Sequence, residues 1–203
     1  MKKFFVEHSY DMVKMFLNQF GIAILGMVLA LATAMAENSL LKNVTSIGAI
    51  LFYLFLLYTM TWEIGYKDKL AVEQGRKVKN VFTGSLISLC ANVPNFIFAI
   101  FITLATFVGS EESIISSIGG VCSFLAMSLE GMYTGVLSNH VGGAPLNSYW
   151  FVYFLLPIPA MITCGISYYL GLKDIKFTSL FDPIPPESDR DPSEKKKPWR
   201  KKQ

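Results

Sequence analysis

Residues 81–109 read VFTGSLISLCANVPNFIFAIFITLATFVG, an uninterrupted stretch without a charged side chain. A helix needs about 20 apolar residues to cross the hydrocarbon core of a bilayer, and a chain in lipid must satisfy its own backbone hydrogen bonds. Three more charge-free stretches approach or exceed this length: residues 20–36, 44–62 and 147–172. The sequence therefore predicts an all-α integral membrane protein.

The overall composition agrees with this prediction. Hydrophobic residues make up 52% of the 203 residues and charged residues 16%, whereas a soluble domain carries about 25% charged residues. We expect an amphipathic N-terminal helix at 1–19, a transmembrane domain at 20–172 and a disordered, basic cytoplasmic tail at 173–203. The first helix is expected either to lie in the headgroup plane or to extend the first span into the cytosol.

The stretch 81–109 is longer than one crossing needs and contains Pro94 in its interior. Proline removes a backbone donor and bends a helix. Small and polar residues recur at spacings of three or four, which predicts a face that packs inside the bundle; they are Gly84, Ser88, Ala91, Asn95, Ala99 and Thr103. We therefore expect a kinked helix in which Asn92 and Asn95 hydrogen-bond to neighbouring helices.

The number of crossings depends on residues 113–141, which are less hydrophobic than the other stretches. Basic residues mark the cytoplasmic side of a membrane protein, and they gather at the N-terminus, at 63–80 and at 173–203. All three are cytoplasmic if the chain crosses four times and 113–141 is a re-entrant or interfacial helix. The alternative has five spans and exports the C-terminus.

A carboxylate inside an apolar stretch is costly and is a candidate functional group. Glu130 is the one acid between residues 113 and 172. In the four-crossing topology we expect it on the wet face of an interfacial helix. Alternatively, Glu130 forms an ion or proton site with Asn92 and Asn95, whose helix would then be broken around Pro94 to expose backbone carbonyls.

A second candidate site lies in the polar segment 63–80. Glu63, Asp68 and Arg76 combine acids and a base near the turn residue Gly75, an arrangement that can bind a phosphate or a lipid headgroup. The simpler interpretation, which we favour, is a tight cytoplasmic hairpin stabilised by a contact between a carboxylate and Arg76.

The end of the chain is strongly basic. It contains six cations around one tryptophan: Lys195, Lys196, Lys197, Trp199, Arg200, Lys201 and Lys202. Such a segment attracts anionic lipid headgroups by about 1 kcal/mol per basic residue, or it acts only as a determinant of topology. Nucleic acid is not an expected partner.

No catalytic, cofactor or metal motif is present in the sequence, so we expect neither a cofactor nor a metal. The leading hypothesis is a non-catalytic accessory or assembly subunit of a complex in the plasma (inner) membrane, with both termini cytoplasmic. Its partners would be the lipid bilayer and another membrane protein or a second copy of the chain. The alternatives are a small permease or channel component and, third, an intramembrane enzyme without a recognisable motif.

Overall fold

A computed structural model describes residues 2–35, 38–108 and 114–175 of the chain. Most of the protein is helical, as predicted. The predicted polybasic tail at 195–202 lies outside the described residues.

The described elements are eight helices, two 3-10 turns and one short hairpin. The helices are α1 (Lys2–Ala34), α2 (Ser39–Glu73), α3 (Thr83–Ala91), α4 (Val93–Val108), α5 (Ile114–Leu129), α6 (Thr134–Leu137), α7 (Val152–Leu155) and α8 (Ile158–Leu172). The 3-10 turns are η1 (Gly131–Tyr133) and η2 (Leu146–Ser148). Strands β1 (His140–Val141) and β2 (Ala144–Pro145) are antiparallel. Gly142 and Gly143 join them at positive φ, which glycine adopts without a steric penalty.

Helices α1 and α2 are longer than the charge-free stretches within them. Helix α1 continues without a break through residues 19 and 20, so the N-terminal residues extend the first span and do not form a separate helix. Helix α2 ends at Glu73, so the prediction of a polar hairpin is wrong for residues 63–73. Polar side chains do not end a helix, and the first strong breaker is Gly75, whose φ is +70°.

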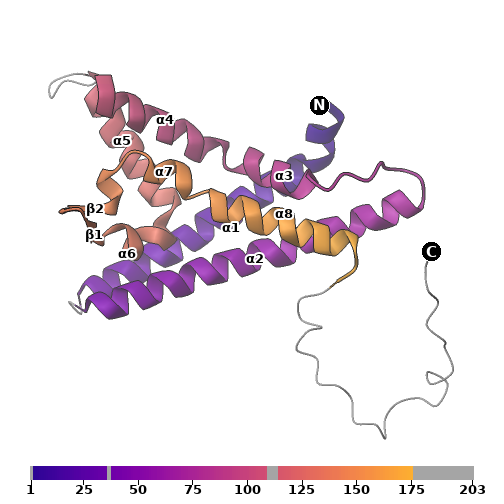
Figure 1. Cartoon of the computed structure of the whole chain (residues 1–203), viewed down its shortest axis with the longest axis horizontal. Coiled ribbons are helices and arrows are strands. Elements are labelled where there is room, and N and C mark those ends of the chain that lie inside the picture. The colour runs from indigo at the N-terminus through magenta and orange to yellow at the C-terminus, as the bar shows by residue number, and fades with distance from the viewer. Residues whose placement is uncertain (1, 36–37, 109–113, 176–203) are drawn as a thin grey trace, which may run out of the picture.

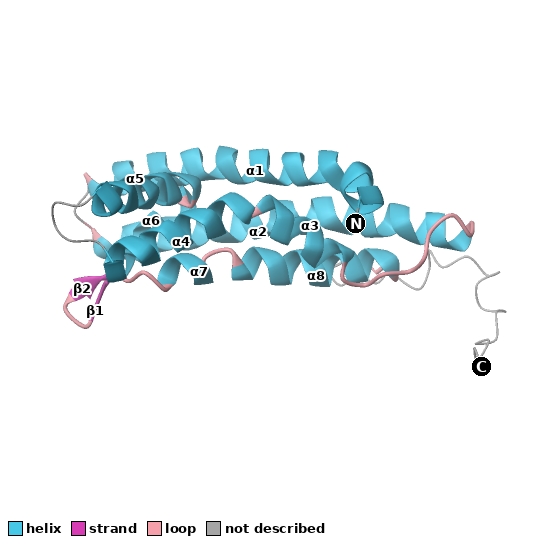
Figure 2. Cartoon of the chain, turned by 90° about the horizontal axis from the view of Figure 1, so that it is seen from above, coloured by secondary structure: helices cyan, strands magenta, loops and turns pink. Residues whose placement is uncertain are grey.

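The two ends of the molecule differ (Figures 1 and 2). The first turns of α1, the loop 74–82 and the end of α8 meet at one end, which we call the polar end; there Lys77 pairs with Glu7. The end of α1, the start of α2 and the β-hairpin lie at the opposite end, which we call the hairpin end. There Asn139 Nδ2 donates to Asn43 Oδ1 over 2.8 Å.

The bend predicted in residues 81–109 is present, but it is a break between two helices and not a kink within one helix. Helices α3 and α4 are bent by 54° at Asn92, two residues before Pro94. Of the predicted packing face, Gly84, Ser88, Ala91, Asn95 and Ala99 are buried and Thr103 is half-buried. The spacing of small and polar residues therefore identified the face that packs within the bundle.

Residues 114–137 form a bent element with both ends at the hairpin end. Helix α5 runs inward beside α4, the chain turns by 84° around Glu130, and α6 returns outward. Close packing fixes this course, because a Cβ on Gly131 would overlap the backbone of Ala23 and a Cβ on Gly135 would overlap that of Lys42.

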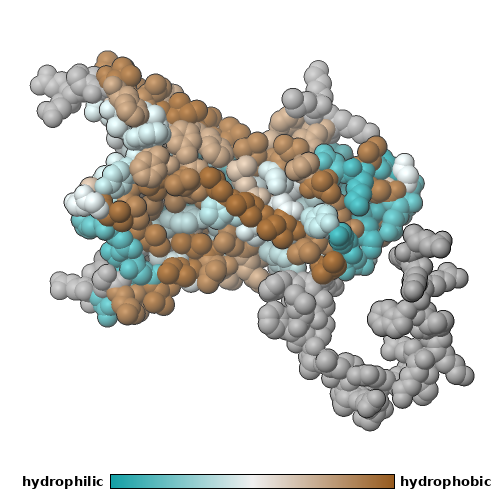
Figure 3. All heavy atoms as spheres, viewed as in Figure 1, coloured by the Kyte–Doolittle hydropathy of each residue, from teal (hydrophilic) through white to brown (hydrophobic). Residues whose placement is uncertain are grey.

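Three helical stretches are long and apolar enough to cross a membrane, namely Phe4–Thr33, Leu40–Glu73 and Val152–Leu172. The two bent pairs raise the number to five if each counts as one span. Figure 3 shows hydrophobic side chains over the middle of the molecule, while hydrophilic ones gather mainly at the polar end. The apolar helices thus have the character of a membrane protein.

Candidate functional site

The first candidate site is a buried polar cluster where the two bent elements meet. Glu130 lies at the break between α5 and η1, and only 3% of the residue is exposed. It faces Gln19, near the middle of α1, and Asn95, in the first turn of α4 just after the other break. The cluster thus joins three elements at the centre of the bundle.

Two amide donors converge on one carboxyl oxygen. Gln19 Nε2 donates to Glu130 Oε1 over 2.9 Å, and Asn95 Nδ2 donates to the same atom over 2.8 Å. Asn95 Nδ2 also donates to Asn92 Oδ1 over 2.9 Å. The structure therefore brings the predicted residues Asn92, Asn95 and Glu130 together. Our preferred expectation of a water-facing Glu130 is wrong, because the side chain is buried against Gln19 of α1 and Asn95 of α4.

The site carries no positive charge to balance an ionised Glu130. Within the described residues, the ion pairs join other side chains. The titratable groups that interact with Glu130 are Tyr53 of α2 and Tyr133 of η1. A buried carboxylate without a cation is strongly disfavoured, so this side chain must hold either a proton or a bound cation.

Two buried polar atoms beside Glu130 have no hydrogen-bond partner in the described part of the chain: Asn95 Oδ1 and the hydroxyl of Tyr133. Buried polar atoms are nearly always hydrogen-bonded. A protonated Glu130 has an O–H to donate, and Asn95 Oδ1 belongs to the same amide that already donates to Oε1. The unpaired acceptor therefore suits a neutral carboxylic acid.

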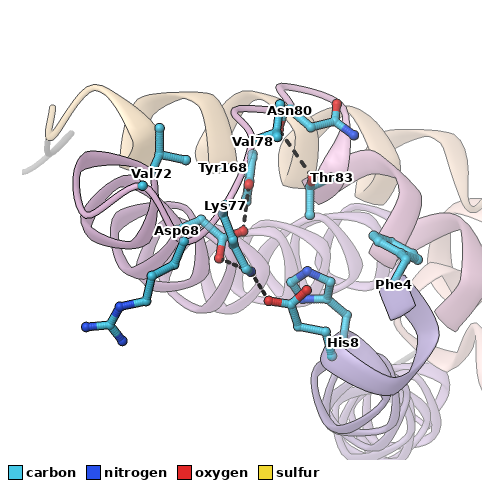
Figure 4. Close-up of a pocket in the computed structure, with 12 residues that line it drawn as sticks. Phe4, His8, Asp68, Val72, Lys77, Val78, Asn80, Thr83 and Tyr168 are labelled. Atoms are coloured by element: carbon cyan, nitrogen blue, oxygen red, sulfur yellow. Dashed lines mark hydrogen bonds and ion pairs between the residues drawn. The ribbon is translucent and has the colours of Figure 1, made fainter. Parts of the chain in front are cut away.

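The second candidate site is a pocket of about 480 Å³ at the polar end (Figure 4). Lys77 Nζ lies 2.5 Å from Glu7 Oε1 and 2.5 Å from Asp68 Oδ1, so one cation joins α1 to α2. The Tyr168 hydroxyl donates to Asp68 Oδ2 over 2.7 Å and adds α8. Three helices are thus tied together around the pocket.

The charges around Lys77 change its proton affinity. Partial burial lowers the pKa of Lys77, but hydrogen bonds to Asp68 and Glu7 and their negative charges outweigh that effect. The net result is a raised pKa, so Lys77 stays protonated through the physiological range. The pocket is accordingly held together by ion pairs centred on Lys77.

The predicted headgroup residues are brought together in part. Asp68 and Arg76 both line the pocket, but Glu63 does not and pairs with Lys67 one turn along α2. The expected contact between a carboxylate and Arg76 is replaced by the contact between Asp68 and Lys77. Asp68 and Lys77 therefore pair with each other at the place where the less favoured interpretation put a phosphate or headgroup site.

Several site residues were not predicted from the sequence: Gln19, Glu7, Lys77 and Tyr168. A signal existed for Gln19, which lies on the apolar face of α1 with His8 and Met15, all three of them now buried. The described residues contain no group of three or more His, Cys, Asp or Glu side chains that could hold a metal ion. Comparison with protein-family models, curated proteins and solved structures found no match to this chain.

Proposed function

We propose that the protein is a small membrane permease or channel component whose ion-binding or proton-binding group is Glu130. The observation that carries this proposal is the pair of hydrogen bonds that Gln19 and Asn95 donate to this buried carboxyl. Ionisable groups at membrane depth typically mark ion pathways and proton relays.

The broken helices support the same proposal. The breaks at Asn92 and Glu130 bend their helix pairs by 54° and 84°, and the two sites are linked through Asn95. Transporters commonly build their substrate and ion sites at such discontinuous helices near the bilayer midplane. We infer four crossings with α5 to α6 re-entrant, because this element leaves and returns to the hairpin end.

Flux measurements on the purified chain test this function. Liposomes containing the wild-type protein should show proton or sodium flux above that of empty liposomes, and Glu130→Gln should abolish it. The matched control is Glu63→Gln, which removes an exposed carboxylate from the same chain. Absence of flux from well-folded wild-type protein would contradict a permease that acts alone.

The accessory or assembly subunit remains the second candidate. It is favoured by the exposure of α2. Only 22% of the most apolar 18-residue stretch of this helix is buried against the rest of the chain. A membrane protein partner or a second copy would cover part of the remainder. Purification in mild detergent with quantitative mass spectrometry tests this, and a stable partner without flux from the chain alone would favour it.

Orientation and the tail complete the proposal. We place the polar end on the cytoplasmic side of a plasma (inner) membrane. Apart from Lys42, every Lys and Arg lies at 2–14, 67–79 or 173–202, and basic residues mark the cytoplasmic side. The cations at 195–202 would then meet anionic headgroups of the inner leaflet. Vesicle binding by chains with and without residues 195–203, at low and high salt, tests this contact.

A further inference from the structure

A line of buried polar side chains leads from Glu130 toward the polar end. Asn95 Nδ2 bonds to both Glu130 and Asn92, and Asn92 Nδ2 donates to the backbone carbonyl of Ser88 over 2.9 Å. The Ser88 hydroxyl lies 3.5 Å from the same nitrogen and also contacts the Cys164 thiol. Asn92 follows the last residue of α3 and Ser88 lies one turn earlier in that helix, so the line runs from the end of α3 toward its start.

The line continues between α2, α3 and α8. The Cys164 thiol contacts the Thr61 hydroxyl, which is hydrogen-bonded to the hydroxyl of Ser167. Ser88, Thr61, Cys164 and Ser167 each have 0% exposure. The hydroxyl and thiol groups are therefore shielded from lipid and lie in the interior of the bundle.

The last members of the line open into the polar-end pocket. Tyr168 follows Ser167 on α8, and its hydroxyl is hydrogen-bonded to Asp68 and Thr83. All three of these side chains line the pocket of about 480 Å³, and Figure 4 shows Tyr168 and Thr83 beside the ion pair of Asp68 and Lys77.

We propose that Glu130 is a proton site and that its proton arrives from the polar-end pocket along this line, which we call the proton route. The inference deepens the proposed function and rests on it. In the loading step, a water molecule in the pocket loses a proton and Glu130 Oε2 gains an O–H bond. Hydroxyl and thiol groups both donate and accept, whereas the Asn92 and Asn95 amides do not release protons. Water molecules therefore carry the proton from the Tyr168 hydroxyl to the Ser167 hydroxyl and from Ser88 to Glu130.

The contacts of the carboxyl favour a proton over a metal cation. Both bonds to Oε1 come from amide N–H groups, whose positive ends would face a metal at that oxygen. The titratable neighbours, Tyr53 from α2 and Tyr133 from η1, are neutral. The groups that face Glu130 from α1 and α4 are the side-chain amides of Gln19 and Asn95, which are also neutral. Glu130 itself is therefore the group that binds the proton.

Infrared spectroscopy of the purified protein tests this without a flux assay. A neutral Glu130 gives a carboxylic acid C=O band near neutral pH, which shifts in D2O and is absent from Glu130→Gln. We expect this band in the wild type, unchanged by sodium. Its absence, or its replacement by a carboxylate band on adding sodium, would overturn the proton site in favour of a metal cation.

The rate of hydrogen–deuterium exchange at this band tests the route. In a Cys90→Ala background, Val78→Cys places a thiol at the pocket and Val141→Cys places one at the hairpin end; both valines are exposed. After coupling to the same bulky maleimide, the label at 78 should slow exchange by about fivefold or more, and the label at 141 should leave it unchanged. Slowing by the label at 141 alone would place the entry at the hairpin end.

A second pair of variants removes hydroxyls without adding bulk. Ser88→Ala should slow exchange, whereas Ser46→Ala should not, because the buried Ser46 hydroxyl bonds to the Met132 carbonyl away from the route. Equal rates in both variants would overturn the route. Absence of flux with the expected exchange pattern would remove the permease function but keep the proton site, so the two failures are distinguishable.

Discussion

Replacing Glu130 by Gln and by Leu separates the hydrogen bonds of this side chain from its ability to ionise. Both replacements have nearly the volume of Glu, but Gln keeps the carbonyl that accepts from Gln19 and Asn95. Its N–H group also imitates the O–H of a neutral acid toward Asn95 Oδ1. We expect Glu130→Gln to change the free energy of unfolding by less than about 1 kcal/mol.

Glu130→Leu leaves both amide donors without an acceptor. A buried donor left unpaired costs about 1–3 kcal/mol, while hydrogen bonds between helices in a membrane average about 0.6 kcal/mol. Applied to the two bonds of 2.9 and 2.8 Å, these limits give a loss of about 1–6 kcal/mol of unfolding free energy.

Unfolding by SDS titration and by heating in mild detergent, followed by circular dichroism, measures both variants against the wild type. A Leu variant as stable as the wild type would show that the two bonds contribute nothing. A Gln variant as unstable as the Leu variant would show that the site needs a charged carboxylate, which contradicts a neutral Glu130.

Three further predictions concern other regions. Gly131→Ala should lower the free energy of unfolding by about 1–3 kcal/mol, because its Cβ would overlap the Ala23 backbone; thermal melting measures this. The raised pKa of Lys77 stabilises the fold below about pH 10 and the effect is lost at higher pH, so the melting temperatures of Lys77→Met and the wild type should converge there. A reporter active only outside the cell should be silent when fused at Gln203 and active at His140.

The sequence predicted those parts of the fold that depend on local chemistry. Pro94 sits beside the break at Asn92, and the spacing of Asn95 with its small neighbours identified a buried face. These predictions succeeded because a helix repeats every 3.6 residues whatever it packs against. The extent of α2 was missed, since polar residues such as Asp68 stop a membrane span but not a helix.

The surroundings of Glu130 could not be predicted from the periodicity of the sequence. A polar stripe on a helix faces either water or a polar interior, and the pattern along the chain is the same in both cases. The decision depends on Gln19, a partner 111 residues away in the sequence. The partner of Asp68 was also missed, because Arg76 and Lys77 are adjacent in the sequence and the turn at Gly75 determines which one points toward α2.

The energetics of the Glu130 cluster argue that stability alone does not explain it. Burying a carboxyl between broken helices sacrifices backbone hydrogen bonds and solvation. A buried polar cluster can often be replaced by well-packed apolar side chains without loss of stability, provided that all of its members are replaced together. A chain that needed only to fold in lipid could close both breaks with continuous apolar helices. Instead, the breaks at Asn92 and Glu130 face each other through Asn95. The fold thereby places one ionisable group where its protonation can be coupled to the arrangement of two bent elements.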